Sequence, residues 1–245
     1  MRNYIFVWIL TLLVTTPLIA SSIDVVFCID TTEGMKGEIK ALKKKVKAIA
    51  KVAHTRMGVV AYRDKGDEYR TKALPLTADV KSVRSFIKEL EAAGGGELED
   101  VRAGLAKAIN EMKWNKGPRL IVLIGDAGPN KERKDKLSCS RLANKAKEKG
   151  ITILALACAE MKLAGVATWK RVAQITEGAY EQLPAAKGRR LLIPEDCGSS
   201  CDSCNIPCDA AGGVQGAATA EKKVKESTAK AMERAVTDQI RALIK

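Results

Sequence analysis

Four largely apolar runs lie along the chain, with room for helices between them. Short runs of this kind are typical of strands that are buried on both faces of a sheet. Two weaker runs are expected to be strands as well, the first of them an antiparallel edge. The central strands are predicted at Val25–Ile29, Arg56–Tyr62, Leu120–Ile124 and Ile151–Ala157, and the weaker ones at Tyr69–Leu76 and Ala179–Leu183.

The segments between these runs repeat their apolar residues at the three- and four-residue spacing of amphipathic helices. Polar capping residues precede several of them. The alternation of strands and helices predicts an α/β fold, with a doubly wound, mostly parallel, Rossmann-like sheet and right-handed crossovers. Helices are predicted at Gly34–Ala53, from the cap at Thr77–Asp79 to Leu90, after Glu97–Asp100, from about Lys134 to Lys149, and at Trp169–Thr176.

The first twenty residues have the pattern of a secretory signal peptide. Arg2 supplies a basic start, Tyr4–Val14 is an apolar stretch, and Ala20 ends a plausible cleavage site before Ser21. An uncleaved membrane anchor is the alternative, but Pro17 and the small residues after it favour cleavage. We therefore expect a secreted, periplasmic or cell-envelope protein.

The expected domain organisation follows from these patterns. A signal peptide at residues 1–20 precedes an α/β domain at residues 21–190. Residues 191–216 form a cysteine-rich segment and a linker, since Ala210–Gly216 has the composition of a flexible chain. A C-terminal amphipathic helix occupies residues 217–245. Docking on its own domain is the commonest fate of such a helix, and a partner or a membrane are the alternatives.

The composition is that of a folded, strongly basic protein. Of the 245 residues, 46% are hydrophobic, which excludes a mostly disordered chain, and only 4% are aromatic. The net charge of +13, from 42 Lys and Arg against 29 Asp and Glu, favours acidic partners. The lysines lie along predicted helix faces and are not interleaved with aromatic residues. Solubility is therefore the preferred interpretation of the charge, and no specific nucleic-acid partner is expected.

Four of the seven cysteines form one cluster, at Cys197, Cys201, Cys204 and Cys208. The first three have the iron–sulfur spacing of radical enzymes, which does not suit an exported chain. A Cys₄ zinc site is a second interpretation, although ligands this close leave little loop to wrap the ion. An oxidising compartment favours disulfides, whose pairing the sequence leaves open. Cys28 and Cys158 lie in apolar surroundings and are expected to be small buried hydrophobic residues.

Two acidic residues follow buried strands at what should be one edge of the sheet. Asp30 ends the first strand and Asp126 follows the Leu120–Ile124 strand. In a doubly wound sheet these strands flank the point where strand order reverses, and ligands bind there. With the hydroxyl of Thr32, the two carboxylates would form an all-oxygen site that suits Mg²⁺, Mn²⁺ or Ca²⁺ and not zinc. The alternative is that both carboxylates only cap helices and loops.

Four motifs spread along the chain resemble the von Willebrand factor A (vWA) family, most closely its bacterial type. They are Ile-Asp-Thr-Thr-x-Gly-Met at 29–35, Met-Gly-Val-Val-Ala-Tyr-Arg-Asp at 57–64, Gly-Gly-x-x-x-Glu-Asp-Val at 94–101 and Leu-Ile-Gly-Asp-Ala-x-Pro at 123–129. The resemblance covers roughly residues 23–183. It implies the fold predicted above and a divalent-cation site, the metal-ion-dependent adhesion site.

The resemblance also implies the ligands of that site, with departures from the family pattern. Asp30 and Thr32 match the first two ligand positions, and Asp126 matches the last acid. Gly34 stands where the family has a second hydroxyl, and the family's separate threonine position falls on Glu97. The implied metal ligands are therefore Asp30, Thr32, Glu97 and Asp126. A third carboxylate would neutralise the ion further and make it a poorer Lewis acid toward a ligand.

Enzyme classes fit the sequence less well. A dinucleotide site needs Gly-x-Gly-x-x-Gly after the first strand, which the chain lacks. A phosphatase of the haloacid-dehalogenase type needs a second Asp two residues after the nucleophile, where Thr32 stands. Glu33 and Glu97 have no evident base or nucleophile partner. We expect no catalytic residue and an exported, non-enzymatic module that binds a protein or cell-surface ligand. A metal-dependent hydrolase of phosphatase type, or a scaffold assembled through the C-terminal helix, are the alternatives.

Overall fold

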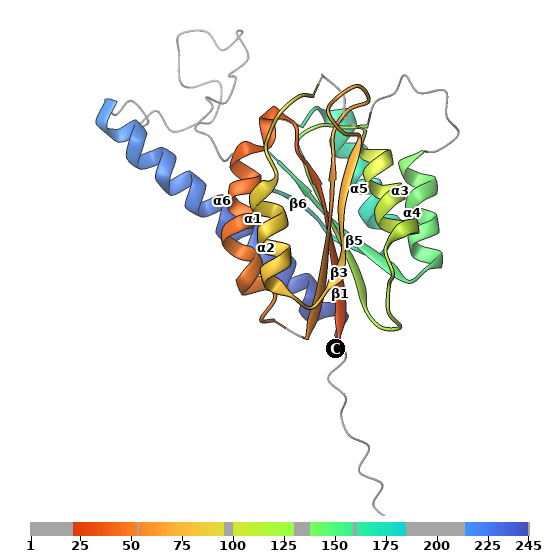
Figure 1. The fold of residues 1–245 in the computed structure, drawn as a ribbon. Coiled ribbons are helices and arrows are strands. Elements are labelled where there is room, and N and C mark those ends of the chain that lie inside the picture. Colours follow the sequence, from red (N-terminus) through yellow and green to blue (C-terminus); the bar gives the residue numbers. More distant parts are fainter. Residues whose placement is uncertain are drawn as a thin grey trace, which may run out of the picture.

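A six-stranded sheet forms the centre of the protein (Figure 1). The computed structural model describes residues 22–52, 54–95, 100–129, 138–158, 161–184 and 214–244, with side chains in the last segment from residue 228 on. The strands are β1 (Ile23–Asp30), β2 (Thr55–Tyr62), β3 (Thr71–Thr77), β4 (Arg119–Gly125), β5 (Ile151–Ala157) and β6 (Tyr180–Gln182). Their order is β3-β2-β1-β4-β5-β6, so the order reverses between β1 and β4.

The four central strands are parallel and almost entirely buried, as their apolar runs predict. β1 pairs with β2 on one side and β4 on the other, and β4 pairs with β5. β3 runs antiparallel to β2 at the edge, which confirms the predicted hairpin. The predicted doubly wound α/β sheet is therefore confirmed. Its physical basis is that strands covered by helices on both faces must be apolar on both faces.

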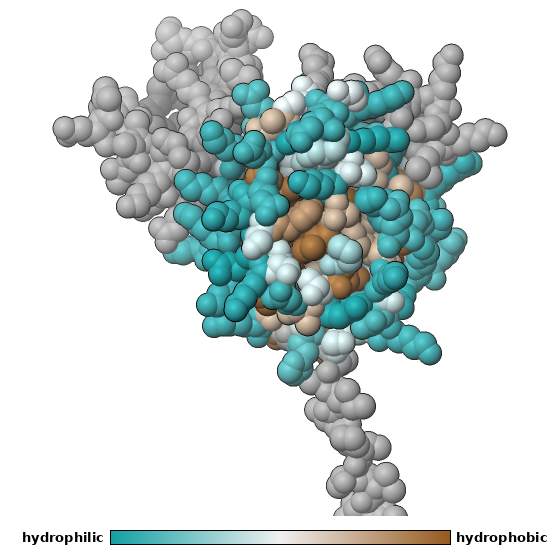
Figure 2. Space-filling view, in the orientation of Figure 1, coloured by the Kyte–Doolittle hydropathy of each residue, from teal (hydrophilic) through white to brown (hydrophobic). Residues whose placement is uncertain are grey.

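Helices cover both faces of this sheet (Figure 1). One layer contains α1 (Lys36–Ile49), which follows the short 3₁₀ helix η1 (Glu33–Met35), together with α2 (Val80–Glu89) and α6 (Val214–Leu243). The other layer contains α3 (Val101–Glu111), α4 (Cys139–Glu148) and α5 (Leu163–Ile175). The outer surfaces of α1 and α2 are hydrophilic, and apolar residues show nearer β3 (Figure 2).

Side-chain caps fix where several helices begin. Asp79 accepts a hydrogen bond from the backbone N–H of Lys81, and Asp100 accepts one from that of Ala103. The prediction that the basic helix begins near Lys134 is wrong, because Ser138 is extended and caps α4 with its side chain. The helix predicted from Trp169 also begins earlier, at Leu163.

The C-terminal helix packs on its own domain, along α1. It begins at Val214, before the expected start at residue 217, so the end of the predicted linker is helical. Its inward side joins the same apolar cluster as α1 and the sheet. Polar contacts at its edges include an ion pair of 2.7 Å between Lys45 and Glu233. Among the side chains of α6 that the structure describes, from residue 228 on, the buried ones are Thr228, Ala229, Met232, Ala235, Val236, Thr237 and Ile240.

Several predictions concern residues outside the described ranges. These are the signal peptide, Glu97 and the cluster of Cys197, Cys201, Cys204 and Cys208. Within the described ranges, no helix is both long and apolar enough to cross a membrane.

Candidate functional site

Three of the four predicted metal ligands come together where the strand order reverses. Asp30 is the last residue of β1, Thr32 follows it by two residues, and Asp126 directly follows β4. Because β1 and β4 are parallel neighbours, both strands end at the same edge of the sheet. Together with Gly34 these residues form what we call the strand-end site.

The Asp30 carboxylate is completely buried, and only one of its two oxygens accepts hydrogen bonds in the structure. Its Oδ1 accepts hydrogen bonds from the backbone N–H of Thr32 at 2.9 Å and from the Thr32 hydroxyl at 2.7 Å. Its Oδ2 has no hydrogen-bond partner in the structure. An unsatisfied buried acceptor costs about 1–3 kcal/mol, and more when it is charged. One carboxylate oxygen of the site therefore remains available for a ligand.

Close packing around Gly125 explains why Asp30 is buried. Gly125, the last residue of β4, lies so close to its neighbours that a Cβ there would meet the Tyr62 hydroxyl, the Trp169 ring and the Asp30 Cβ within 3.2 Å. A side chain at position 125 would collide with these neighbours, whereas glycine leaves room for Asp30. The Asp30 carboxylate is thus enclosed by packed side chains, and its exposure is 0%.

The electrostatics of the site disfavour two negative charges. Burial and, to a smaller extent, the neighbouring charge of Asp126 together raise the pKa of Asp30 from 3.8 to about 7. The two hydrogen bonds from Thr32 and the charge of Arg63 act in the opposite direction. A cation placed between the carboxylates would remove both causes of the raised pKa, because it adds positive charge and satisfies the buried oxygen.

Asp126 fills the space that a side chain at position 34 would need. A Cβ on Gly34 would lie within 3.0 Å of Asp126 Oδ2, which real Cβ atoms essentially never show. In the vWA pattern described above, position 34 carries a hydroxyl. Here the carboxylate oxygen of Asp126 lies in that space. The strand-end site therefore has two carboxylates and one hydroxyl within the described residues.

Arg63, which was not predicted as a site residue, lies buried next to the site. Its guanidinium donates to the carbonyls of Thr31 at 3.2 Å and Glu91 at 2.7 Å. It also stacks 4.3 Å from the centre of the Tyr69 ring. Arg63 thereby joins the loop after β1 to the loop after α2 and places a positive charge near Asp30. Its position in the Tyr-Arg-Asp part of the second family motif was the one available signal.

A second set of hydrogen bonds positions the loop that carries Thr32. The Thr31 hydroxyl donates to the carbonyl of Tyr62 at 3.1 Å and shares a bond of 2.8 Å with the Tyr69 hydroxyl. The backbone N–H of Ala93 donates to the carbonyl of Thr31, and that of Glu33 donates to Gly94. These contacts hold the loop from both sides, so the geometry of Thr32 is set before any ligand binds.

The three cysteines in the described ranges are free thiols in the core. This confirms the prediction that Cys28 and Cys158 are small buried residues, and Cys139 is buried as well. Burial raises the pKa of Cys139 to about 11 and raises the pKa of Cys28 and Cys158 well above its usual value. Thiols in this state are poor nucleophiles and poor metal ligands.

Among the residues that the structure describes, no three His, Cys, Asp or Glu side chains are arranged to hold a metal ion. An ion at the strand-end site would need donors beyond the two carboxylates. The Thr32 hydroxyl can supply one, and water or a ligand can supply others. Glu97, the fourth predicted ligand, lies outside the described residues.

Comparison with known families and structures gives a consistent result. The model of the von Willebrand factor type A domain matches residues 24–183. No curated protein matches the sequence. Proximal thread matrix protein 1 from the mussel byssus superposes with a TM-score of 0.55 at 15% identity, over 68% of this chain and 42% of that chain. The same mussel protein was also solved with a zinc-occupied MIDAS motif.

Two bacterial structures extend the comparison. A von Willebrand factor type A structure from Catenulispora acidiphila has a TM-score of 0.53 at 16% identity, over 87% of this chain and 43% of that chain. The pilus adhesin SpaC from Lactobacillus rhamnosus GG has a TM-score of 0.51 at 12% identity, over 67% and 29%. The chain thus spans less than half the length of each of these structures, and at such identities the likeness concerns the fold alone.

Proposed function

Because the chain belongs to the von Willebrand factor type A family, we propose that it is a non-enzymatic binding module whose ligand site contains a divalent cation. Asp30, Thr32 and Asp126 would hold Mg²⁺, Mn²⁺ or Ca²⁺, with Glu97 as a further ligand. The observation that carries this proposal is Asp30 Oδ2, which is buried without a partner beside a second carboxylate. A cation would satisfy that oxygen and offset the repulsion between the two acids.

The residues of the site fit a hard cation. Carboxylate and hydroxyl oxygens are the donors that such ions prefer. Thr32 keeps Asp30 oriented through its two hydrogen bonds, and Arg63 fixes the backbone on either side. A bound cation would supply an exchangeable coordination position for an oxygen atom of the partner. That partner would be a protein or cell-surface ligand, met outside the cell or in its envelope after export by the N-terminal segment.

The geometry gives little support to hydrolysis. Asp30 is the candidate nucleophile of a phosphatase-type enzyme, but it is buried and its Oδ1 is engaged by Thr32. Thr32 also occupies the position at which such an enzyme needs a second acid. Adhesion-related proteins, a byssus matrix protein and a pilus adhesin, share the fold. These features favour binding as the role of the domain.

Calorimetric titration of the purified protein with Mg²⁺ or Mn²⁺ should show binding to one site. Asp30→Asn should abolish it, because the cation loses the carboxylate whose buried Oδ2 has no partner in the structure. Binding should also stabilise the fold, by about 2.7 kcal/mol at a metal concentration of 100 times Kd. Glu89→Gln, at an exposed position of α2, removes the same charge elsewhere and should bind normally.

Two results would contradict the proposal. The first is the absence of any heat or thermal shift at millimolar metal, which would leave a cation-independent module. The second is turnover of a generic phosphate ester that Asp30→Asn abolishes, which would favour the hydrolase.

Gly34→Ser should increase the affinity for the cation by about tenfold, which corresponds to about 1.4 kcal/mol. The new Cβ would displace Asp126 Oδ2, whose side chain can rotate away, and the serine would add a neutral oxygen donor. Gly34→Ala is the matched control, since it displaces the carboxylate without adding a donor. Calorimetry can measure the cation affinity of both variants. Equal affinities of Gly34→Ser and Gly34→Ala would show that the missing hydroxyl does not limit cation binding at this site.

A further inference from the structure

A groove between α1 and α2 is lined almost entirely by cations. It has a volume of about 460 Å³ and is lined by Lys43, Lys81, Arg84, Ser85 and Lys88. No acidic residue lines it. We call it the α1–α2 groove. It lies on the helical layer, whereas the strand-end site lies at the sheet edge.

Of the four basic residues that line the α1–α2 groove, Lys43 is the one whose side chain makes hydrogen bonds within the described part of the fold. Lys43 Nζ donates to the carbonyls of Lys88 at 3.0 Å and Leu90 at 3.2 Å, at the C-terminal end of α2. In the part of the chain that the structure describes, the side chains of Lys81, Arg84 and Lys88 make no hydrogen bond or ion pair, and all three are exposed. Burial lowers the pKa of Lys43, the nearby charge of Glu91 acts against this shift, and the charge of Lys88 adds to it.

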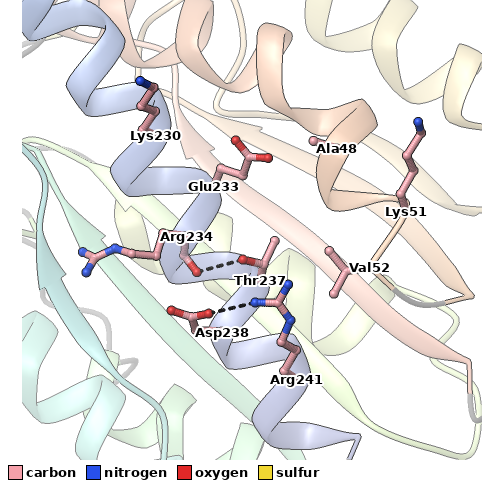
Figure 3. A pocket seen from close by; sticks show the side chains of 9 residues that line it. All are labelled: Ala48, Lys51, Val52, Lys230, Glu233, Arg234, Thr237, Asp238 and Arg241. Carbon is pink, nitrogen blue, oxygen red and sulfur yellow. Dashed lines mark hydrogen bonds and ion pairs between the residues drawn. The ribbon is translucent and has the colours of Figure 1, made fainter.

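A neighbouring groove on the same layer shows that this lack of pairing is not general. The groove between α1 and α6, of about 590 Å³, also contains basic side chains (Figure 3). There Arg241 pairs with Asp238 at 3.2 Å, and Arg234 pairs with Glu181 at 3.2 Å. Glu233 pairs with Lys45. Acids therefore neutralise much of the α1–α6 groove, while the α1–α2 groove keeps its excess positive charge.

We propose that the α1–α2 groove binds the sulfate or carboxylate groups of an anionic polysaccharide. Like charges held together destabilise the fold unless a ligand neutralises them, and Arg and Lys donors fit such oxyanions. A bilayer surface would favour exposed apolar side chains here, but the one large exposed hydrophobic residue in the described ranges, Leu163, begins α5 on the other face of the sheet. No aromatic residue lines the groove to stack nucleic-acid bases.

Binding of a heparin oligosaccharide tests this proposal with two variants of equal net charge. The triple variant Lys81→Glu, Arg84→Glu, Lys88→Glu should bind at least about tenfold more weakly than the wild type, because three ion contacts become repulsive. Its affinity should also depend less steeply on salt, because fewer counterions are released. The control Lys113→Glu, Lys116→Glu, Lys145→Glu changes exposed lysines elsewhere and should retain most of the affinity.

Three further measurements make the result decisive. A glutamine version of the groove variant, checked by circular dichroism and thermal unfolding, should also lose affinity while remaining folded. Asp30→Asn and added chelator should leave heparin binding unchanged, since the groove does not depend on the cation site. Equal losses in the groove and control variants would overturn the proposal and leave only an effect of net charge. Binding to phosphatidylglycerol vesicles or single-stranded DNA through the groove, without binding to heparin, would overturn it too.

Discussion

Replacing Asp30 with asparagine is expected to stabilise the metal-free protein at pH 8, by up to about 4 kcal/mol. The pKa of Asp30 rises from an ordinary value of 3.8 to about 7 through burial and the charge of Asp126. A shift of about three units corresponds to about 4 kcal/mol. Asparagine keeps an oxygen that can accept the two hydrogen bonds from Thr32. Its amide nitrogen takes the place of the unpaired oxygen and carries no charge.

The expected dependence on pH follows from the direction of the shift. Between about pH 4 and pH 7 the folded protein retains the proton on Asp30, whereas the unfolded chain has released it. The unfolded state therefore binds fewer protons, and the Asp30 contribution to stability decreases as the pH rises through this window. Above pH 7 the contribution is constant. The asparagine variant lacks this term, so its advantage over the wild type should grow from about pH 4 to pH 7.

Urea unfolding at several pH values, with chelator and then with Mg²⁺, measures this effect. Comparing the wild type with Asp30→Asn cancels the titration of the groups that do not interact with Asp30. Added Mg²⁺ should reverse the order of stability, because only the wild type binds the cation. A variant less stable than the wild type at pH 8 in chelator would show that the Asp30 charge is already compensated within the protein.

Val236→Asp on α6 is expected to lower the free energy of unfolding by more than about 3 kcal/mol. Val236 is completely buried in the cluster that joins α6 to α1 and the sheet. An aspartate there would place an unpaired charge in an apolar environment. Ala242→Asp introduces the same charge at an exposed position of the same helix and should change the stability by less than about 0.5 kcal/mol.

Two probes distinguish global unfolding from detachment of the helix. Trp169 belongs to the core on the opposite face of the sheet and Trp114 packs against it, so tryptophan fluorescence reports on that core and not on α6. Limited proteolysis reports on α6. If α6 is part of the cooperative unit, the urea transition seen by fluorescence should shift in Val236→Asp. Equal transitions for the two variants, with proteolysis confined to α6, would instead favour a helix that is free to assemble with partners.

The strand-end site and the α1–α2 groove divide the chemistry of the domain between two surfaces. The site combines buried acids with little positive charge beyond Arg63. The groove combines exposed cations without acids. If both proposals hold, the domain binds a cation-dependent ligand at the sheet edge and an anionic polymer on its helical layer. Two weak contacts on one module increase the overall affinity when both partners occur on one surface.

The fold could be predicted from the sequence because its signals are local. Apolar runs mark the strands that helices cover on both faces, and Asp79 and Asp100 were readable as helix starts because a cap depends only on residues two or three positions away. The alternation of elements then places Asp30 and Asp126 at neighbouring strand ends. This much of the candidate site follows from periodicity and from the topology that periodicity implies.

The arrangement of side chains at the strand-end site was decided by tertiary packing alone. Asp126 fills the space above Gly34, and Arg63 joins Thr31 to Glu91, although no pattern in the sequence relates these positions. Lys43 likewise reaches from α1 to the end of α2, where it lines the α1–α2 groove. Such contacts depend on the relative placement of side chains from separate elements. That placement is set by the packing of the whole core, which local propensity does not encode.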